Sequence, residues 1–225
     1  ATTFLRAGHN FIRGGEIRGI IAPGTGLGEG LLVEIDGRLF ARGSEGGHCD
    51  FAPVDGEQLA LLAWMREKTR PVSYEKLIAG PGFAHLYDFS KEFYGLPETA
   101  AIALAMAGAK DRTPIIVNGA VGSDGCPVCR RAMELFLSIL GSEAGNLALK
   151  LYARGGIYLG GGILPRLVGK ISFTGFLRSF CDKGAMAELM GTIPVQLITR
   201  ADAALLGAAH YGGTVLFNNP PPRAG

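Results

Sequence analysis

A short loop at residues 44–53 gathers side chains that could bind a polyhydroxylated ligand. It reads Ser-Glu-Gly-Gly-His-Cys-Asp-Phe-Ala-Pro and carries the carboxylates of Glu45 and Asp50 on either side of the His48 imidazole. Ionised carboxylates accept hydrogen bonds, and an imidazole donates or accepts according to its tautomer. Glu45 and His48 therefore suit the hydroxyls of a sugar, whereas we expect Asp50 to brace the loop. The alternative is a surface loop with a satisfied histidine.

A glycine-rich turn, Pro-Gly-Thr-Gly-Leu-Gly at residues 23–28, precedes this loop between two apolar segments. Glycine leaves no Cβ to block a triphosphate, and successive backbone N–H groups can surround phosphate oxygens together with a hydroxyl. The residues that could do so here are Gly24, Thr25, Gly26 and Gly28. Taken alone, a turn of this kind between two strands is most often an ordinary tight hairpin. Beside an acceptor-rich loop, it indicates a small-molecule kinase.

Four further segments follow in order, at residues 73–82, 140–149, 155–166 and 204–210. They read SYEKLIAGPG, LGSEAGNLAL, GGIYLGGGILPR and ALLGAAH. With the turn and the loop, they resemble the carboxyl-terminal portion of the bacterial-type glucokinases, within the actin-like sugar kinase superfamily. The resemblance spans nearly the whole chain. It implies an α/β fold with α+β character, namely the large lobe of an actin-like, ribonuclease-H-like sugar kinase with a mixed sheet and flanking helices.

The resemblance also implies roles for particular residues. Glu45, His48 and Glu75 would bind the sugar, the glycine turn would hold phosphate, and Gly161 and Gly162 would line the adenosine pocket. The ligands would be glucose and ATP with Mg²⁺, and the reaction would be transfer of the γ-phosphoryl group to the 6-hydroxyl of glucose. The residues also permit simpler interpretations: an exposed helix glutamate for Glu75, and close strand-to-helix packing for the 160–162 glycines.

In the glucokinases the catalytic base belongs to an Asn-Asp pair, and the first phosphate motif lies near the amino terminus. We find neither in this chain, so we expect residues 1–217 to be the large lobe without its amino-terminal partner. The last helix could pack on that small lobe, and residues 218–225 are expected to be a frayed tail. Two alternatives stay open: a non-catalytic sugar-binding sensor lobe, and a kinase for a related hexose or amino sugar. We expect a homodimer.

The composition of the chain argues against a nucleic-acid-binding protein and against a membrane protein. The 225 residues are 48% hydrophobic, which is ample for a buried core, and the net charge of +2 gives no field for nucleic acid. Apolar runs are interrupted before they reach bilayer-spanning length, and the first residues do not form a signal peptide. We therefore expect a cytoplasmic protein without nucleic-acid or membrane partners.

The chain has four cysteines, at positions 49, 126, 129 and 181, and cysteines can bind a metal ion. Cys126-Pro-Val-Cys129 has the spacing of metal ligands, but a structural zinc site uses four ligands and no second pair is present. A related branch of the superfamily binds zinc through a cluster of three cysteines and the histidine equivalent to His48, and this chain offers only two. We therefore expect no metal and no structural disulfide.

Hydrophobic periodicity and turn residues predict a mixed succession of strands and helices. Strands are predicted at 17–22, 30–35, 38–41, 157–159 and 195–198, with a hairpin at Asp36-Gly37. Helices are predicted at 56–69, 83–94, 97–107, 127–153 and 203–210, with a short one around Glu75 that Ser73 would cap. The start of the chain is expected to be helical. Residues 108–125 are expected to be an insertion, with a strand at 115–117 or an extended loop.

Overall fold

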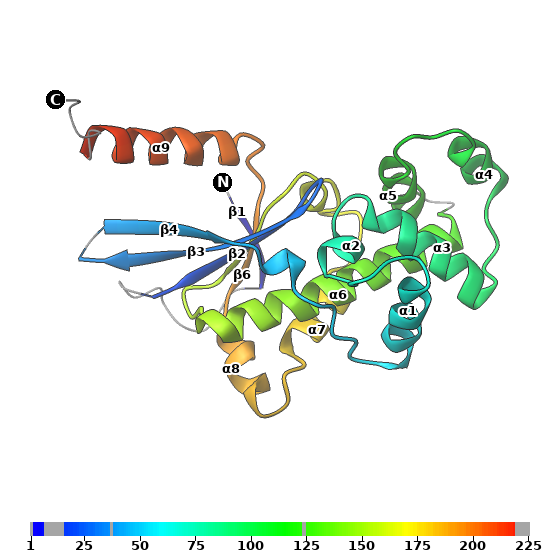
Figure 1. Cartoon of the computed structure of the whole chain (residues 1–225), viewed down its shortest axis with the longest axis horizontal. Coiled ribbons are helices and arrows are strands. Elements are labelled where there is room, and N and C mark those ends of the chain that lie inside the picture. The colour runs from blue at the N-terminus through cyan, green and yellow to red at the C-terminus, as the bar shows by residue number, and fades with distance from the viewer. Residues whose placement is uncertain (1, 7–15, 37, 123–124, 219–225) are drawn as a thin grey trace.

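The structure is a computed structural model that describes residues 2–6, 16–36, 38–122 and 125–218. Within these residues the strands form one six-stranded sheet with the order β1-β6-β5-β2-β3-β4 (Figure 1). The strands are β1 (Thr2–Arg6), β2 (Arg18–Pro23), β3 (Leu27–Ile35), β4 (Arg38–Ser44), β5 (Ile157–Leu159) and β6 (Val195–Ile198). The sheet is mixed and carries helices, which confirms the predicted fold class.

The β2, β3 and β4 strands form an antiparallel meander, as the sequence predicts. Asp36 has a left-handed backbone (φ 50) beside the β3–β4 turn, while Gly37 lies outside the described residues. The short β5 strand runs parallel to both β2 and β6, with Leu159 opposite Ile21 and Leu197. This parallel arrangement brings the end of β5 beside the end of β2, where the glycine turn begins.

The start of the chain is a strand, so the expectation of a helix there is wrong. Residues of β1 pair antiparallel with β6, with Thr2 opposite Ile198. The Thr2 hydroxyl also donates a hydrogen bond to Gln196 at 2.9 Å. This pairing joins segments from the two ends of the chain, and local sequence periodicity carries no signal for it.

The α-helices are α1 (Gly56–Arg66), α2 (Glu75–Ile78), α3 (Gly82–Tyr94), α4 (Ala100–Met106), α5 (Thr113–Val121), α6 (Pro127–Leu151), α7 (Thr174–Cys181), α8 (Ala187–Thr192) and α9 (Ala203–Asn218). Short 3₁₀ turns lie at η1 (Gly46–His48), η2 (Leu164–Arg166) and η3 (Gly184–Met186). The α7 and α8 helices have no counterpart among the predicted elements. The predicted last helix is longer than expected and extends to Asn218.

Capping residues explain the starts of α1 and α4 and the end of α3, but not the start of α2. The Asp55 side chain caps α1 by accepting a hydrogen bond from the Gln58 N–H at 2.8 Å. As predicted, α3 ends at Gly95, whose left-handed backbone (φ 59) suits glycine. Thr99 caps α4, so this helix begins later than predicted. The expected cap by Ser73 is wrong, because Tyr74 precedes the first residue of α2 and makes no side-chain cap.

Residues 113–121 form the α5 helix, so neither alternative expected for this segment is correct. Pro114 occupies the first turn, where a missing N–H costs no hydrogen bond. Ile116, Val117 and Ala120 are buried and lie on one helical face, which packs toward α6. Tertiary packing thus overrides the strand preference of the β-branched run.

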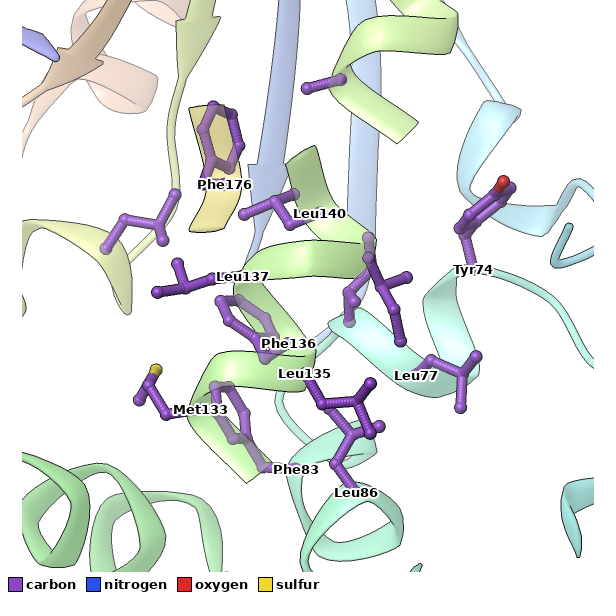
Figure 2. Packing of buried hydrophobic residues seen from close by; sticks show 14 of the residues in the cluster. Tyr74, Leu77, Phe83, Leu86, Met133, Leu135, Phe136, Leu137, Leu140 and Phe176 are labelled. Carbon is purple, nitrogen blue, oxygen red and sulfur yellow. The ribbon is translucent and has the colours of Figure 1, made fainter. Parts of the chain in front are cut away.

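The long α6 helix is the centre of the hydrophobic core (Figure 2). Its Phe136 is fully buried and stacks on Phe83 of α3 with the ring centroids 4.4 Å apart. Burying a side chain of this size contributes about 1.5–3 kcal/mol. On the opposite side of α6, Gly141 lies directly against the backbone carbonyl of Phe176 in α7, so only glycine fits there. The α6 helix contacts β2 of the sheet as well as α3, α5 and α7.

The α9 helix lies across the sheet from α6 (Figure 1). Its Leu205 is 73% exposed, and Leu206 and Tyr211 are also exposed. Residues 219–225, which make up most of the predicted frayed tail, lie outside the described residues. Among the described helices, none combines the length and the apolar character that a membrane crossing requires.

Candidate functional site

The three predicted sugar-binding side chains lie together beside the glycine turn. His48 lies between two carboxylates, with Nε2 3.8 Å from Glu45 Oε2 and Nδ1 3.7 Å from Glu75 Oε1. The side chains of Glu45 and His48 are 92% and 60% exposed, whereas that of Glu75 is 30% exposed. The cluster is thus an open surface of acceptors and one imidazole, with room for a ligand.

Close packing of glycine shapes the loop that carries Glu45 and His48. The loop turns through η1, in which the His48 N–H donates to the Glu45 carbonyl at 3.0 Å. A Cβ at Gly46 would overlap the Glu29 carboxylate, and a Cβ at Gly47 would overlap the backbone of Leu27. A larger residue at position 47 would push the loop off β3, and one at position 46 would displace the Glu29 carboxylate, so both glycines help to set where Glu45 and His48 lie.

Asp50 braces the same loop through its backbone. It forms an isolated antiparallel β-bridge with Ser73, next to a hydrogen bond from the Tyr74 N–H to the Cys49 carbonyl at 3.1 Å. The residue itself is exposed. This bridge ties the loop to the segment that leads into α2, and so it sets the distance between His48 and Glu75.

Glu75 belongs to the sugar cluster and also holds the glycine turn. Its Oε2 accepts a hydrogen bond from the Leu27 backbone N–H at 3.0 Å. A Cβ at Gly26 would lie 2.7 Å from the same oxygen, closer than a side chain can approach. A side chain at position 26 would therefore displace the Glu75 carboxylate and weaken its hydrogen bond with Leu27.

The turn is fixed on its other side by the segment between α2 and α3. The Gly24 N–H donates to the Gly26 carbonyl at 2.8 Å, which closes the turn. The Gly80 N–H donates to the Gly24 carbonyl at 2.7 Å, and the Thr113 hydroxyl donates to the Gly80 carbonyl at 2.8 Å. A continuous set of hydrogen bonds thus joins the glycine turn to the first residue of α5.

The second glycine segment lies against the first. After β5, the Gly160 N–H donates to the Ile21 carbonyl at 2.8 Å. Gly161 has a positive φ of 85, and a Cβ there would overlap the carbonyl of Pro23 at the end of β2. Close strand-to-strand packing therefore accounts for Gly160 and Gly161. For Gly162 no atom lies within 4 Å of an added Cβ, so its side is open space.

A cavity of about 520 Å³ opens between these segments. Its lining combines the glycine turn, the Gly80-Pro81 segment, the start of α5 and the loop after β5. The lining residues are Gly24, Thr25, Gly80, Pro81, Asp111, Thr113, Pro114, Val117, Asn118, Gly162, Ile163 and Arg166. The cavity thus has apolar walls with a few polar groups, as small-molecule sites commonly do.

The predicted nucleotide residues do not all reach this cavity. Gly24, Thr25 and Gly162 line it, whereas Gly26 faces Glu75 and Gly161 packs on Pro23. Gly28 lies within β3 and lines a different hollow, between the sheet and α9.

Sequence reasoning missed four polar residues that line the cavity: Asp111, Thr113, Asn118 and Arg166. Three of them belong to the segment expected to be an insertion. The Thr113-Pro114 pair, a common helix start, was the signal that could have revealed α5.

A buried carboxylate lies beneath the sugar loop. Glu29 is 8% exposed, and its Oε1 has no hydrogen-bond partner among the described residues. Burial raises its pKa to about 7, the Glu143 carboxylate adds to this rise, and Lys150 opposes it. The other carboxylate oxygen of Glu29 lies against Gly46. Ionisation of Glu29 would therefore place a negative charge directly beneath the sugar loop.

No group of three or more His, Cys, Asp and Glu side chains in the described segments is arranged to hold a metal ion. Cys126 and Cys129 are both buried as free thiols at the start of α6. His48, equivalent to the histidine that binds zinc in the related branch, lies near Glu45 and Glu75.

Sequence comparison finds this chain similar to glucokinases. The glucokinase family model matches residues 4–214. A glucokinase of Yersinia pestis (strain Pestoides F) is 38% identical over 193 residues, which cover 85% of this chain and 56% of the relative. The chain therefore spans little more than half the length of this curated relative.

Solved structures of glucokinases share the fold of this chain. A glucokinase from an Antarctic psychrotroph superposes with a TM-score of 0.78 at 33% identity, over 92% of this chain and 61% of that one. A ROK family glucokinase from Streptomyces griseus, solved in complex with glucose and AMPPNP, shares the fold with a TM-score of 0.62 at 22% identity. That alignment covers 88% of this chain and 61% of that one. By its family match and its fold, this chain belongs to the glucokinase family.

Proposed function

We propose that the protein transfers the γ-phosphoryl group of ATP to the 6-hydroxyl of glucose, and that this chain supplies the sugar loop and part of the nucleotide site. The observation that carries the proposal is the double contact of Glu75. One of its oxygens faces His48 in the sugar cluster, and the other accepts the N–H of Leu27 at the glycine turn. A sugar and a phosphate bound at these two places would be neighbours, as in-line phosphoryl transfer requires.

The sugar cluster suits a hexose because of its hydrogen-bonding groups. Glu45 and Glu75 provide acceptors for hydroxyl protons, and His48 can donate or accept. A site that pairs with each hydroxyl discriminates against analogues that lack one, since its own polar groups would then be unpaired. The Streptomyces griseus relative was solved with glucose, which supports glucose as the substrate of this chain.

The cavity suits a nucleoside triphosphate. The glycine turn lies at one end, where Gly24 and Thr25 can meet phosphate oxygens. Apolar walls formed by Pro114, Val117 and Ile163 can enclose a flat base. The same relative was solved with AMPPNP, an ATP analogue, which supports ATP as the donor.

Magnesium would enter with the nucleotide. Mg²⁺ in kinases is held by one or two carboxylates together with substrate phosphates, rather than by an all-protein cage. That requirement fits the described residues, which offer single carboxylates such as Asp111 at the cavity but no cluster of metal ligands. When bound, the ion would neutralise the charge that develops on the transferred phosphoryl group.

The catalytic base is proposed to lie outside these 225 residues, in a part of the family that this chain does not cover. Phosphoryl transfer requires a group that accepts the proton of the attacking hydroxyl. The resemblance assigns that role to an Asp in an Asn-Asp pair, and the chain spans 56% of the Yersinia relative. We therefore expect the isolated chain to bind ligands without turning them over.

A coupled assay tests the proposed function. The protein expressed from the complete gene is mixed with ATP, Mg²⁺ and glucose, and ADP formation is followed. The expected result is ADP release that depends on glucose and exceeds that with N-acetylglucosamine or mannose. Preference for another sugar would identify a related hexose or amino-sugar kinase. Sugar binding without ADP release would identify a sensor and would contradict the proposal.

A further inference from the structure

Two buried cysteines lie side by side at the start of α6, away from the sugar cluster. Cys126 is the residue immediately before the helix, Pro127 occupies the first turn, and Cys129 follows one turn later. The two residues are 1% and 0% exposed, and both are free thiols. A side-chain hydrogen bond joins the two thiols, so a small adjustment brings their sulfurs within bonding distance.

The surroundings make the two thiols chemically unequal. Burial alone would raise the pKa of Cys126, but the backbone N–H groups of Cys129 and Thr99 outweigh it, so the pKa lies below its ordinary value. Burial, the neighbouring Cys126 and the Glu98 carboxylate all raise the pKa of Cys129. A helix amino terminus and Cys-x-x-Cys spacing both favour a reactive thiol, but reactive cysteines are also partly exposed, so this buried pair reacts only when its cover opens.

We propose that Cys126 and Cys129 form a reversible dithiol–disulfide site whose oxidation weakens nucleotide binding. The oxidant is a low-molecular-weight disulfide of the glutathione type. Reversible disulfides inside cells are usually catalytic or redox-sensing rather than structural, so this site does not require an oxidising compartment.

The reaction proceeds by thiol–disulfide exchange. The Cys126 thiolate attacks one sulfur of the oxidant, a mixed disulfide forms and one small thiolate leaves. The Cys129 thiol then gives up its proton to the small thiolate already released, and its sulfur attacks Cys126 and expels the second small thiolate. Two cysteine sulfurs are oxidised and the small disulfide is reduced to two thiols, which take up the protons that Cys126 and Cys129 lose.

The α4 helix provides a route for the oxidant. It has seven residues, none of them buried, and its Leu104 is 80% exposed. Segments with few buried contacts open locally at low free-energy cost. Thr99, which caps α4, also contributes one of the N–H groups near Cys126. Opening of α4 would therefore uncover the pair without unfolding the core.

The α5 helix links the cysteine pair to the nucleotide cavity, and this link rests on the proposed function. The Cys126 N–H donates to the Gly119 carbonyl at 3.0 Å. A Cβ at Gly119 would lie 2.8 Å from the Cys129 sulfur, so the sulfur fills the space beneath this glycine. Its neighbour Asn118 lines the cavity. Drawing Cys129 toward Cys126 would remove that support from α5.

Peptide mapping tests the site itself. The purified chain is incubated with oxidised glutathione, alkylated and digested, and its cross-links are read by mass spectrometry. The expected product is a Cys126–Cys129 disulfide that dithiothreitol reverses. It should persist in the control variant Cys49→Ser/Cys181→Ser and be absent in Cys126→Ser, whose serine remains a good residue before a helix. Two free thiols at 126 and 129 after treatment, or stoichiometric zinc bound to them, would overturn the site.

Nucleotide titration tests the consequence. The dissociation constant of a fluorescent ATP analogue is measured for the reduced and oxidised chain, and for Cys126→Ser under both conditions. Couplings between sites are commonly 5–150-fold, so oxidation should weaken binding by at least about fivefold in the wild type alone. Equal affinities would overturn the link to the cavity. Absence of binding in both states would instead refute the proposed nucleotide site, while the mapped disulfide would stand.

Discussion

The Glu75 carboxylate accepts a hydrogen bond at 3.0 Å from the backbone N–H of Leu27, the first residue of β3. Its other oxygen lies 3.7 Å from His48 Nδ1. One side chain therefore contacts both the sugar cluster and the strand that leaves the glycine turn. Changes at Glu75 should affect both ligands, whereas changes at Glu45 should affect one.

Replacement of Glu75 tests this double contact. In the complete protein, Glu75→Ala should raise the KM for glucose and the KM for ATP together, because it removes both interactions. Glu75→Gln keeps an acceptor for the Leu27 N–H and should affect glucose more than ATP. Hydrogen bonds to charged groups are worth about 1.5–3 kcal/mol, so the glucose effect should be tenfold or more. Steady-state kinetics in both substrates measures it, and an Ala variant with an unchanged KM for ATP would contradict the link.

Alanine variants at two glycines of the turn should distinguish a loss of ATP affinity from a loss of stability. A Cβ at Gly24 would have no atom closer than the Gly26 carbonyl at 3.9 Å, so Gly24→Ala should leave the melting temperature nearly unchanged. If phosphate approaches this backbone, the same variant should lose ATP affinity. Gly26→Ala should instead lower the melting temperature, because its Cβ would lie 2.7 Å from Glu75 Oε2.

Thermal melts and ATP titrations of the two variants check this prediction. Gly162→Ala is a second probe of the cavity, since no protein atom lies within 4 Å of its added Cβ. Full ATP affinity in both Gly24→Ala and Gly162→Ala would show that the nucleotide binds elsewhere.

Much of the site could be predicted because it depends on local sequence. Glycine turns and acceptor-rich loops have short-range signatures, and the apolar runs on either side of Gly24 identify β2 and β3. The structure adds what the loop sequence cannot show, namely that the Glu75 carboxylate lies against Gly26 and that the backbone of Pro23 leaves room only for glycine at position 161. The pattern identified the turn, and of its glycines Gly24 is the one that lines the cavity.

The parts that could not be predicted depend on distant packing. The β1 strand exists because it pairs with β6 near the other end of the chain. The Ile115-Ile116-Val117 run favours a strand by local preference, yet it is helical because Ile116 and Val117 bury one face of α5. Asn118 of α5 and Asp111 just before it line the cavity, and neither could be assigned to it while this segment was expected to be an insertion.

Protonation of Glu29 should make stability depend on pH. The pKa of this buried carboxyl is about 7, against an ordinary value of 4.5, so the folded chain holds a proton that the unfolded chain has released between those pH values. The free energy of unfolding should therefore fall as the pH rises from about 4.5 to about 7.

The Glu29→Gln variant should not show this loss. Each pKa unit corresponds to about 1.4 kcal/mol, so the variant should gain on the order of 1–3 kcal/mol relative to the wild type between pH 5 and pH 8. Urea unfolding at the two pH values measures the difference, and Glu188→Gln at an exposed position is the matched control. An equal pH dependence in the wild type and Glu29→Gln would show that Glu29 is charged throughout.

The core around α6 should be sensitive to truncation. Phe136 is fully buried and stacked on Phe83, so Phe136→Ala should lower the free energy of unfolding by about 3–5 kcal/mol. Leu104→Ala, at a position that is 80% exposed, should change it by less than about 0.5 kcal/mol. Chemical denaturation of both variants compares them, and similar losses would mean that the packing around α6 is not the main source of stability.

The most direct test of the sugar site is the kinetic effect of Glu45→Gln and His48→Ala in the complete protein. The two side chains lie 3.8 Å apart in the exposed cluster and do not line the nucleotide cavity. Each variant should lower kcat/KM for glucose about tenfold or more while the dissociation constant for ATP stays nearly unchanged. Normal phosphorylation of glucose by both variants would contradict this prediction.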